Sequence, residues 1–286
     1  MGKRIVLFND LPGYGKVALA AMVPLFSRMG HFPYQVPTAV VSNTLDFGKF
    51  RIQDMTDYMR DTIKVWDELG FDPDCICTGF VLSEEQVELI GDYIRSRKPR
   101  IDEIQNVNNG RLVMVDPIMA DGGKLYNGIG MERVAAMRKL VSYSDVMVPN
   151  MTEAGFLTGI CPGRERASAS ELRELVDGLH KLSGKSVVIT SAQDSETDEH
   201  LVCGYDHKSG QYFRVPFIFF PVRVAGSGDI FSTVMTGKLL NGESLEEAVR
   251  EAVRVLTVLI RENQSHLDEY KGILVERYWK LLDENN

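Results

Sequence analysis

Short apolar segments rich in β-branched residues alternate along the chain with longer segments of helical periodicity. Short apolar runs are typical of buried strands, whereas apolar residues three and four positions apart are typical of helices. The predicted strands are residues 4–8, 35–41, 74–78, 111–115, 145–148 and 186–190. Strands separated by helices predict an α/β fold, in which a mostly parallel central sheet lies between two helical layers (α/β/α).

The last third of the chain adds two further patterns. Residues 201–205 and 211–216, joined by a turn that contains Gly210, predict an antiparallel hairpin at one edge of the sheet. Residues 245–260 carry apolar side chains at positions 245, 248, 249, 252, 253, 256 and 260, which form one face of a long helix. Because the chain contains no internal repeat, low-complexity tract or linker, we expect a single domain over residues 1–286.

Three helix starts carry the capping-box pattern, in which a Ser side chain and a Glu or Gln three residues later bond each other's backbone N–H groups. The pairs are Ser83 with Gln86, Ser168 with Glu171, and Ser244 with Glu247. These pairs predict where three of the helices begin.

Composition narrows the class of protein. The chain has 286 residues, 44% hydrophobic and 25% charged, and this balance is typical of a folded globular protein rather than a disordered one. A net charge of −8 argues against general binding to nucleic acid or anionic membranes, so an anionic ligand must be held locally. The apolar runs are too short for a membrane span or a signal peptide, so we expect a cytoplasmic protein.

The four cysteines agree with that compartment, because they are scattered and form no C-x-x-C pair. Cys75 and Cys77 alternate along a predicted strand, which places both on one face of it. No His or Cys at suitable spacing completes a metal site around them, so burial in the sheet explains the pair better.

Ligands of open α/β sheets bind outside the carboxyl ends of the strands. The strongest loop there is Gly226-Ser227-Gly228-Asp229, which leads into a helix that runs to about residue 240. Two glycines allow a ligand close to the backbone, and the free N–H groups of the helix start favour a phosphate. Asp229 would repel that phosphate unless it handles a proton, which makes it a candidate general base. An ordinary glycine turn before a helix explains the same four residues.

Two further loops carry acidic residues. Asn150 and Glu153 follow the strand at residues 145–148, and they are either another capping box or part of a hydrated Mg²⁺ site. Asp116 and Asp121 lie in the loop after the strand at residues 111–115, with two glycines beside them. A turn explains those glycines, but it does not explain two carboxylates in one loop.

The loop after the first strand offers a rival hypothesis. Gly13-x-Gly15-x-x-Ala18 satisfies the dinucleotide-binding fingerprint in its Gly/Ala form, which predicts an NAD-dependent enzyme. Against this, four residues separate the strand from Gly13, and the second strand ends without the acidic residue that would bind the ribose. A phosphate-binding P-loop also fails, because Gly184-Lys185-Ser186 lacks the required glycine five positions earlier.

Taken together in chain order, these motifs resemble those of the ribokinase-like superfamily of ATP-dependent small-molecule kinases. The residues that carry the resemblance are Asp116-Pro117, Asn150-x-x-Glu153 and Gly226-Ser227-Gly228-Asp229. Within that superfamily the chain is similar to the pyridoxal/pyridoxamine kinase branch, on Phe8-Asn9-Asp10, Tyr14-Gly15-Lys16, Thr78-Gly79-Phe80, and residues 37–42 and 115–126.

The resemblance implies transfer of the γ-phosphate of ATP to the 5′-hydroxyl of a B6 vitamer. It implies that Asp229 accepts the hydroxyl proton and that the N–H groups at Gly226, Ser227 and Gly228 stabilise the transferring group. It also places Asn9, Thr44 and Phe80 at the vitamer, and Asp116, Asn150, Glu153, Thr190 and Ser191 at the nucleotide, with Glu153 and Asp116 near Mg²⁺.

The cofactors implied are ATP and Mg²⁺, with K⁺ as a further candidate cation, and the assembly implied is a homodimer. Three alternatives stay open at this point. A hydroxymethylpyrimidine kinase of the same superfamily acts on a similar ring, a non-catalytic vitamer- or nucleotide-binding protein would retain the pocket, and the NAD enzyme is the third. The preferred vitamer is also open, because residues 42–47 are one residue shorter than the corresponding family segment.

Overall fold

The computed structural model describes residues 2–44, 47–97, 111–126, 129–264 and 272–282. Its centre is a sheet in the order β12-β11-β10-β8-β5-β4-β1-β2-β3, with β9 paired to β10. The strands are β1 (Arg4–Pro12), β2 (Phe32–Val41), β3 (Ile52–Asp54), β4 (Cys75–Thr78), β5 (Leu112–Val115), β8 (Val146–Met147), β9 (Arg166–Ala167), β10 (Ser186–Asp194), β11 (His200–Asp206) and β12 (Gln211–Pro216). The pairs from β2 through β10 are parallel, whereas β3 and the β11–β12 hairpin are antiparallel at the two edges.

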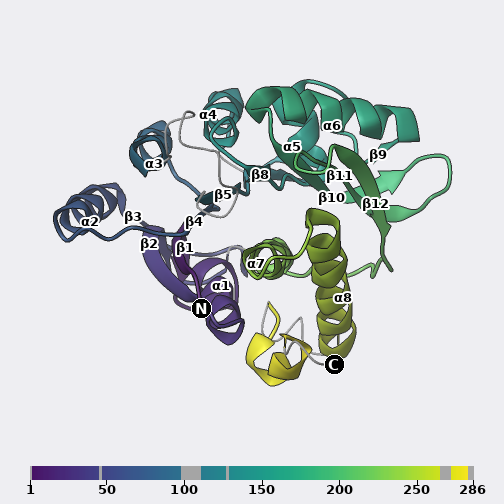
Figure 1. Cartoon of the computed structure of the whole chain (residues 1–286). Helices are drawn as coiled ribbons and strands as arrows, with labels where there is room; N and C mark the ends of the chain where they lie inside the picture. The colour runs from purple at the N-terminus through teal and green to yellow at the C-terminus, as the bar shows by residue number, and fades with distance from the viewer. Residues whose placement is uncertain (1, 45–46, 98–110, 127–128, 265–271, 283–286) are drawn as a thin grey trace.

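Helices cover both faces of this sheet (Figure 1). On one face lie α2 (Thr56–Glu68), α3 (Glu84–Arg97), α4 (Met131–Val141), α5 (Met151–Thr158) and α6 (Ala169–Ser183). On the other lie α1 (Ala18–Arg28), α7 (Ser227–Leu240), α8 (Leu245–Asn263) and the 3₁₀ segment η3 (Val275–Leu282). The predicted three-layer α/β/α fold with a mostly parallel sheet and an edge hairpin is confirmed.

Each face of the sheet has its own hydrophobic core. Along β1 the side chains alternate, so that Val6 and Phe8 pack under α3 and its neighbours while Ile5 and Leu7 pack against α1 and α7. All four are at most 1% exposed. A strand buried on both faces is apolar at every position, which is why the sequence shows short continuous apolar runs rather than strict alternation.

The predicted strands all exist, and their ends are the main difference. The second begins at Phe32 rather than at residue 35, and the first and sixth extend to Pro12 and Asp194. Strand β3 and the small hairpin of β6 (Ala120–Asp121) with β7 (Lys124–Leu125) were not predicted. Elements of two or three residues are too short to leave a periodic signal, and their pairing partners alone define them.

The capping boxes at Ser168 and Ser244 are confirmed. At Ser83 only one of the two predicted hydrogen bonds forms. Ser83 Oγ does accept a hydrogen bond from the Gln86 N–H at 3.2 Å. The Gln86 side chain instead accepts from the N–H of Leu82 at 2.8 Å and donates to the carbonyl of Thr38 at 2.9 Å. Because Gln86 is fully buried, its amide bonds to the partners that burial provides rather than to its own helix start.

Cys75 and Cys77 are buried on one side of β4 with their sulfur atoms 3.7 Å apart, as the alternation predicts. Among the described residues every cysteine is free. Within the same residues, none of the helices combines the length and the apolar character needed to cross a membrane.

Candidate active site

Loops from distant parts of the chain meet at the carboxyl ends of the parallel strands. Asn9, in the second half of β1, donates a hydrogen bond to Asp229 at the start of α7, across 220 positions of sequence. Ser232, one turn further along α7, donates to Asp116 after β5 at 3.0 Å. The first turn of α7 therefore joins the loops that follow β1 and β5, and this is the edge of the sheet at which ligands are expected.

Asp229 is held by two donors. Its Oδ1 accepts from Asn9 Nδ2 at 3.1 Å, and its Oδ2 accepts from the backbone N–H of Ala18 at 2.8 Å. Burial raises the pKa of this carboxyl above its ordinary value, and the two hydrogen bonds act against that rise. A carboxylate whose orientation is fixed and whose pKa is raised is well suited to accept a proton near neutral pH.

The side chain of Asn9 is engaged at both ends. Its Oδ1 accepts from the N–H of Phe80 at 2.8 Å and from its own neighbour Asp10 at 3.0 Å, so that its amide nitrogen points at Asp229. Gly79 makes this possible, because a Cβ there would lie within 2.5 Å of the amide. Asn9 is 1% exposed. Its contact with the vitamer stays a prediction, whereas its role in holding Asp229 is visible in the geometry.

The start of α7 is open on the side of Gly228. Gly226 adopts φ +81° as the residue before the helix, and a Cβ there would lie 2.7 Å from the carbonyl oxygen of Lys16. A Cβ on Gly228, in contrast, would meet nothing within 4 Å. Gly226 is therefore needed for packing against the β1–α1 loop, and Gly228 leaves room beside the first N–H groups of the helix, including that of Ser227.

Asp116 and Glu153 form a second acidic pair next to Asp229. Burial raises the pKa of Asp116, and the charges of Glu153 and Asp229 raise it further. Burial likewise raises the pKa of Glu153 to about 7, against three backbone hydrogen bonds that lower it. Carboxylates that repel each other in a buried place lower their free energy when a cation binds between or beside them.

Glu153 and Asn150 do form a capping box at the start of α5. Glu153 Oε2 accepts from the N–H of Asn150 at 2.9 Å, and Oε1 accepts from the N–H of Met119 at 3.0 Å. Asn150 Nδ2 donates to the carbonyl of Ala120 at 2.8 Å, which ties the loop after β5 to this helix. Capping and a role at the site are thus compatible, since the backbone N–H groups fix the carboxylate and oppose the rise in its pKa that burial causes.

These residues meet the requirements of Mg²⁺ when it is bound with a nucleotide. Among the described residues no three His, Cys, Asp or Glu side chains are grouped closely enough to hold a metal ion by themselves. Mg²⁺ usually takes only one or two carboxylates, with waters and phosphates as its other ligands. Asp116 uses only Oδ2 for Ser232, so it has an oxygen left for a cation, whereas both oxygens of Glu153 already accept backbone N–H groups.

Asp10 contributes a further carboxylate. It belongs to the motif Phe8-Asn9-Asp10, but no role was predicted for it. Burial and the facing charge of Asp229 raise its pKa to about 7. Ser232 and the backbone N–H of Ala18 are two other contributors that the sequence did not reveal. Ser232 could have been found from its spacing, because it lies three residues after Asp229 on one helix face.

Thr190 and Ser191 lie where β10 passes the end of β8. The N–H of Thr190 donates to the carbonyl of Pro149 at 2.9 Å, directly before Asn150. Ser191 has φ +55°, and the pairing of β10 with β11 shifts register between Ile189 and Ala192. Such a bulge turns a side chain away from its strand, and bulges are common beside functional sites. The predicted contact of both residues with the nucleotide stays a prediction.

Thr44 and Phe80 stand beside the loops that hold Asp229. Thr44 is 4% exposed, and its Cγ2 lies about where a Cβ of Gly15 would be. Its hydroxyl has no hydrogen-bond partner among the described residues. Phe80 is half-buried, and its carbonyl accepts from Thr38 Oγ1 at 2.7 Å. Their contacts with a vitamer stay predictions.

The geometry of the β1–α1 loop argues against the dinucleotide fingerprint. In that motif the first N–H groups of the helix bind a pyrophosphate. Here the N–H of Ala18, the first residue of α1, is bonded to the carboxylate of Asp229, which would repel a pyrophosphate. Gly13 and Gly15 instead pack against Ser42 and Thr44.

Comparisons with known proteins support the kinase hypothesis. A model of the phosphomethylpyrimidine kinase family matches residues 20–274. The pyridoxine/pyridoxal/pyridoxamine kinase of Bordetella avium is 30% identical over 250 residues, which cover 85% of this chain and 79% of that protein.

Solved structures agree with this assignment. A crystal structure with pyridoxal from Bacteroides thetaiotaomicron, described as a phosphomethylpyrimidine kinase, has a TM-score of 0.90 and 32% identity, and covers 99% of this chain and 96% of that one. Pyridoxal kinase from Lactobacillus plantarum shares the fold with a TM-score of 0.85 at 24% identity, over 98% of this chain and 96% of that one. The chain therefore belongs to the phosphomethylpyrimidine kinase family, and it is a small-molecule kinase of the pyridoxal kinase group in the ribokinase-like superfamily.

Proposed function

We propose that this kinase transfers the γ-phosphate of ATP to the 5′-hydroxymethyl group of a B6 vitamer. The observation that carries the proposal is Asp229, fixed by Asn9 and Ala18 at the open start of α7, with its pKa raised by burial. Relatives named for pyridoxine, pyridoxal and pyridoxamine kinase activity support the choice of substrate. Relatives of the fold were also solved with ADP.

In this proposal each residue has a separate task. Asp229 accepts the proton of the substrate hydroxyl as that oxygen attacks the phosphorus atom. The N–H groups at Gly226, Ser227 and Gly228 stabilise the charge on the phosphoryl oxygens. Asn150 positions Glu153, while Asn9, Thr44 and Phe80 border the vitamer, and Thr190 and Ser191 border the nucleotide.

Asp116 and Glu153 are the residues that would hold Mg²⁺. The bound ion supplies neutralisation of the polyphosphate charge, which an acidic site needs before a nucleotide can approach. Asp116 offers a free oxygen, and Glu153 contributes its charge from a fixed position. K⁺ is part of the proposal as an additional cation, and replacing KCl with NaCl in the assay tests it.

A second candidate function is phosphorylation of hydroxymethylpyrimidine, which the name of the matching family favours. The test is ADP release by the purified enzyme with Mg²⁺ and ATP, with pyridoxal, pyridoxine, pyridoxamine and hydroxymethylpyrimidine offered separately. We expect turnover with at least one B6 vitamer and less with the pyrimidine. Preference for the pyrimidine would select the second function, and binding without turnover of any compound would point to a non-catalytic binding protein.

We also propose that residues 1–286 form one kinase domain and act as a homodimer in the cytoplasm. The continuous sheet that joins β12 to β3 supports one domain. Cysteines that are free throughout the described residues agree with a reducing compartment. Light scattering on the eluted protein measures the assembly, and a monomeric mass would reject the dimer.

A further inference from the structure

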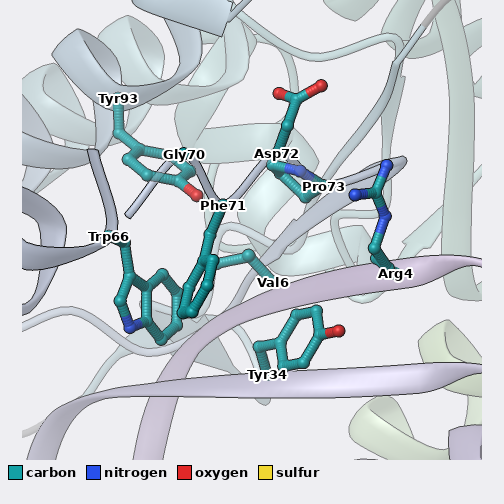
Figure 2. Close-up of a pocket in the computed structure, with 9 residues that line it drawn as sticks. All are labelled: Arg4, Val6, Tyr34, Trp66, Gly70, Phe71, Asp72, Pro73 and Tyr93. Carbon is teal, nitrogen blue, oxygen red and sulfur yellow. The ribbon is translucent and has the colours of Figure 1, made fainter. Parts of the chain in front are cut away.

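A cavity lies at the edge of the sheet opposite to the active site (Figure 2). Its walls are Arg4 and Val6 of β1, Tyr34 of β2, Trp66 of α2, residues 70–73 before β4, and Tyr93 of α3. Arg4 and Asn9 are five residues apart on the same strand, which corresponds to roughly 16 Å. The cavity is therefore separate from the residues around Asp229.

Aromatic rings form one side of this cavity. The ring centroids of Tyr34 and Trp66 are 6.3 Å apart at 70°, and those of Trp66 and Phe71 are 6.2 Å apart at 53°. Figure 2 shows these three rings gathered together, with Arg4 and Asp72 across from them. Tyr34 and Phe71 are 43% and 52% exposed, which is unusual for large aromatic side chains that could pack inside.

The hydroxyl of Tyr93 is a buried donor without a partner. The residue is 2% exposed, and its ring packs between Phe8 and the guanidinium of Arg97. Within the part of the chain that the structure describes, its hydroxyl has no hydrogen bond. In Figure 2 this hydroxyl points toward Phe71 inside the cavity. Burial raises the pKa of Tyr93 to about 12, so the group stays protonated and can donate. A buried hydroxyl is normally paired, so an acceptor is missing here.

The charges around the cavity are already matched. Arg4 pairs with Asp74 at 3.3 Å, and Arg111, behind the wall, pairs with Asp72. Arg97, which lies over Tyr93, pairs with Asp67. Nη1 of Arg111 is buried without a hydrogen-bond partner among the described residues, but each of the three arginines has a carboxylate there, so these residues offer no unbalanced charge for an ion. A neutral ligand fits this arrangement better.

The volume limits the size of that ligand. The cavity measures about 140 Å³. An engineered protein cavity of ~150 Å³ accepts benzene, whereas sites for drug-sized ligands measure ~300 to 1,000 Å³. A single substituted ring fits, and a nucleotide does not.

We propose that this cavity is a second binding site, for a neutral single-ring aromatic or heteroaromatic compound with a carbonyl or hydroxyl acceptor. The ring lies against Trp66 and Phe71, and the acceptor receives a hydrogen bond from the hydroxyl of Tyr93. No step of the phosphoryl transfer uses this site, so its occupation can be measured without ATP or a vitamer.

The fluorescence of Trp66 reports the proposal directly. The chain has two tryptophans, Trp66 and Trp279, so the full-length W279F variant leaves only the one in the cavity wall. We expect benzamide, a neutral ring with a carbonyl, to change this fluorescence in a saturable way. Toluene, which lacks an acceptor, is the comparison compound.

Two matched variants, both made in the W279F background, test whether the hydroxyl of Tyr93 donates to the acceptor of the ligand. Tyr93→Phe removes only the hydroxyl, and we expect benzamide to bind about fivefold more weakly while toluene is unaffected. Tyr34→Phe makes the same chemical change on the other tyrosine of the wall and should leave both affinities unchanged. Melting temperatures of the variants confirm that each is folded.

Three outcomes would overturn the proposal. The first is the absence of a saturable response of Trp66 to benzamide. The second is equal affinity of benzamide for the Tyr93→Phe variant and its parent, and the third is equal weakening by Tyr34→Phe.

Discussion

The two ends of the parallel strands, called here the amino edge and the carboxyl edge of the sheet, differ in how their charged side chains are paired. At the amino edge Asp72 and Asp74 each face an arginine, Arg111 or Arg4. At the carboxyl edge burial raises the pKa of Asp10, Asp116, Glu153 and Asp229, and the charge of Asp229 raises the pKa of Asp10 and of Asp116 further. None of the four forms an ion pair within the described residues. Matched charges stabilise a fold, whereas unmatched buried carboxylates cost stability unless a ligand balances them.

Unbalanced charge, rather than residue composition, marks the candidate functional site of this fold. Both edges contain polar residues, aromatic rings and glycines, so composition does not separate them. What separates them is that, within the described residues, the acids of the carboxyl edge have hydrogen-bond donors but no cationic side chain as a partner, so a bound cation would balance their charge. This contrast leads to five predictions, ordered from the largest expected effect to the smallest.

The largest effect is expected from Asp229→Asn, which removes the proposed base. Turnover should fall by about 10²- to 10⁴-fold, because the hydroxyl proton then has no acceptor. ADP release measures this loss, while calorimetry with vitamer and nucleotide should show that binding is retained. Asp229→Ala, which introduces no amide donor opposite Ala18, controls for the new hydrogen bond. Turnover at the parent rate in either variant would remove Asp229 from the mechanism.

Asn9→Ala tests the residue that holds Asp229. We expect kcat to fall about 10- to 100-fold with a small change in KM, because a hydrogen bond to a charged group is lost. That hydrogen bond lowers the pKa of Asp229, so its loss should move the acidic limb of the pH–rate profile to higher pH. A lower melting temperature with an unmoved acidic limb would mean that Asn9 is only structural.

Ser232→Ala removes the donor to Asp116 and should have a smaller effect. We expect the KM for Mg·ATP to change by about three- to tenfold, because the carboxylate of Asp116 is then no longer held in one orientation by Ser232. The matched control is Thr233→Val, whose hydroxyl bonds the backbone of its own helix rather than a carboxylate. Equal effects of the two substitutions on KM would contradict the role of Ser232.

The acidic edge also predicts how stability depends on pH. The folded pKa of Asp10 is raised to about 7 from 3.8, so the folded state binds more protons than the unfolded state between these values. Without Mg²⁺ the free energy of unfolding should therefore fall as the pH rises from about 4 to 7. Asp10→Asn should flatten part of this slope, as urea titrations at each pH would measure. A slope identical to that of the parent would show that Asp10 does not titrate there.

The smallest effect is expected at the amino edge. Asp72→Asn removes the charged partner of Arg111, whose side chain is 11% exposed against 59% for Asp72, and stability should fall by about 1 to 2 kcal/mol. Turnover should not change, because this residue lies at the opposite end of the strands from Asp229. A large loss of activity would break the distinction between the two edges.

Much of the geometry of the candidate site was predictable from short motifs, while the roles of its residues in catalysis and binding stay predictions. A glycine turn before an acidic helix start identifies Asp229, and an asparagine three residues before a glutamate identifies both the cap and the charge at Glu153. The role of Asn9 in holding Asp229 was not predictable, because their contact spans 220 positions. Asp10 was missed for the same reason, since its raised pKa depends on a residue from the other end of the chain.

The order of the longer strands and helices and the helix starts at Ser168 and Ser244 could be predicted from the sequence alone, because hydrophobic periodicity and capping are local. Short motifs in chain order indicated the superfamily. Three features became visible only in the tertiary structure. The side chain of Gln86 donates to the carbonyl of Thr38, and the N–H of Ala18 at the start of α1 donates to Asp229. Among the described residues, the buried hydroxyl of Tyr93 has no hydrogen-bond partner. The physical reason is that burial and charge depend on neighbours brought together by folding, and these neighbours are distant in the sequence.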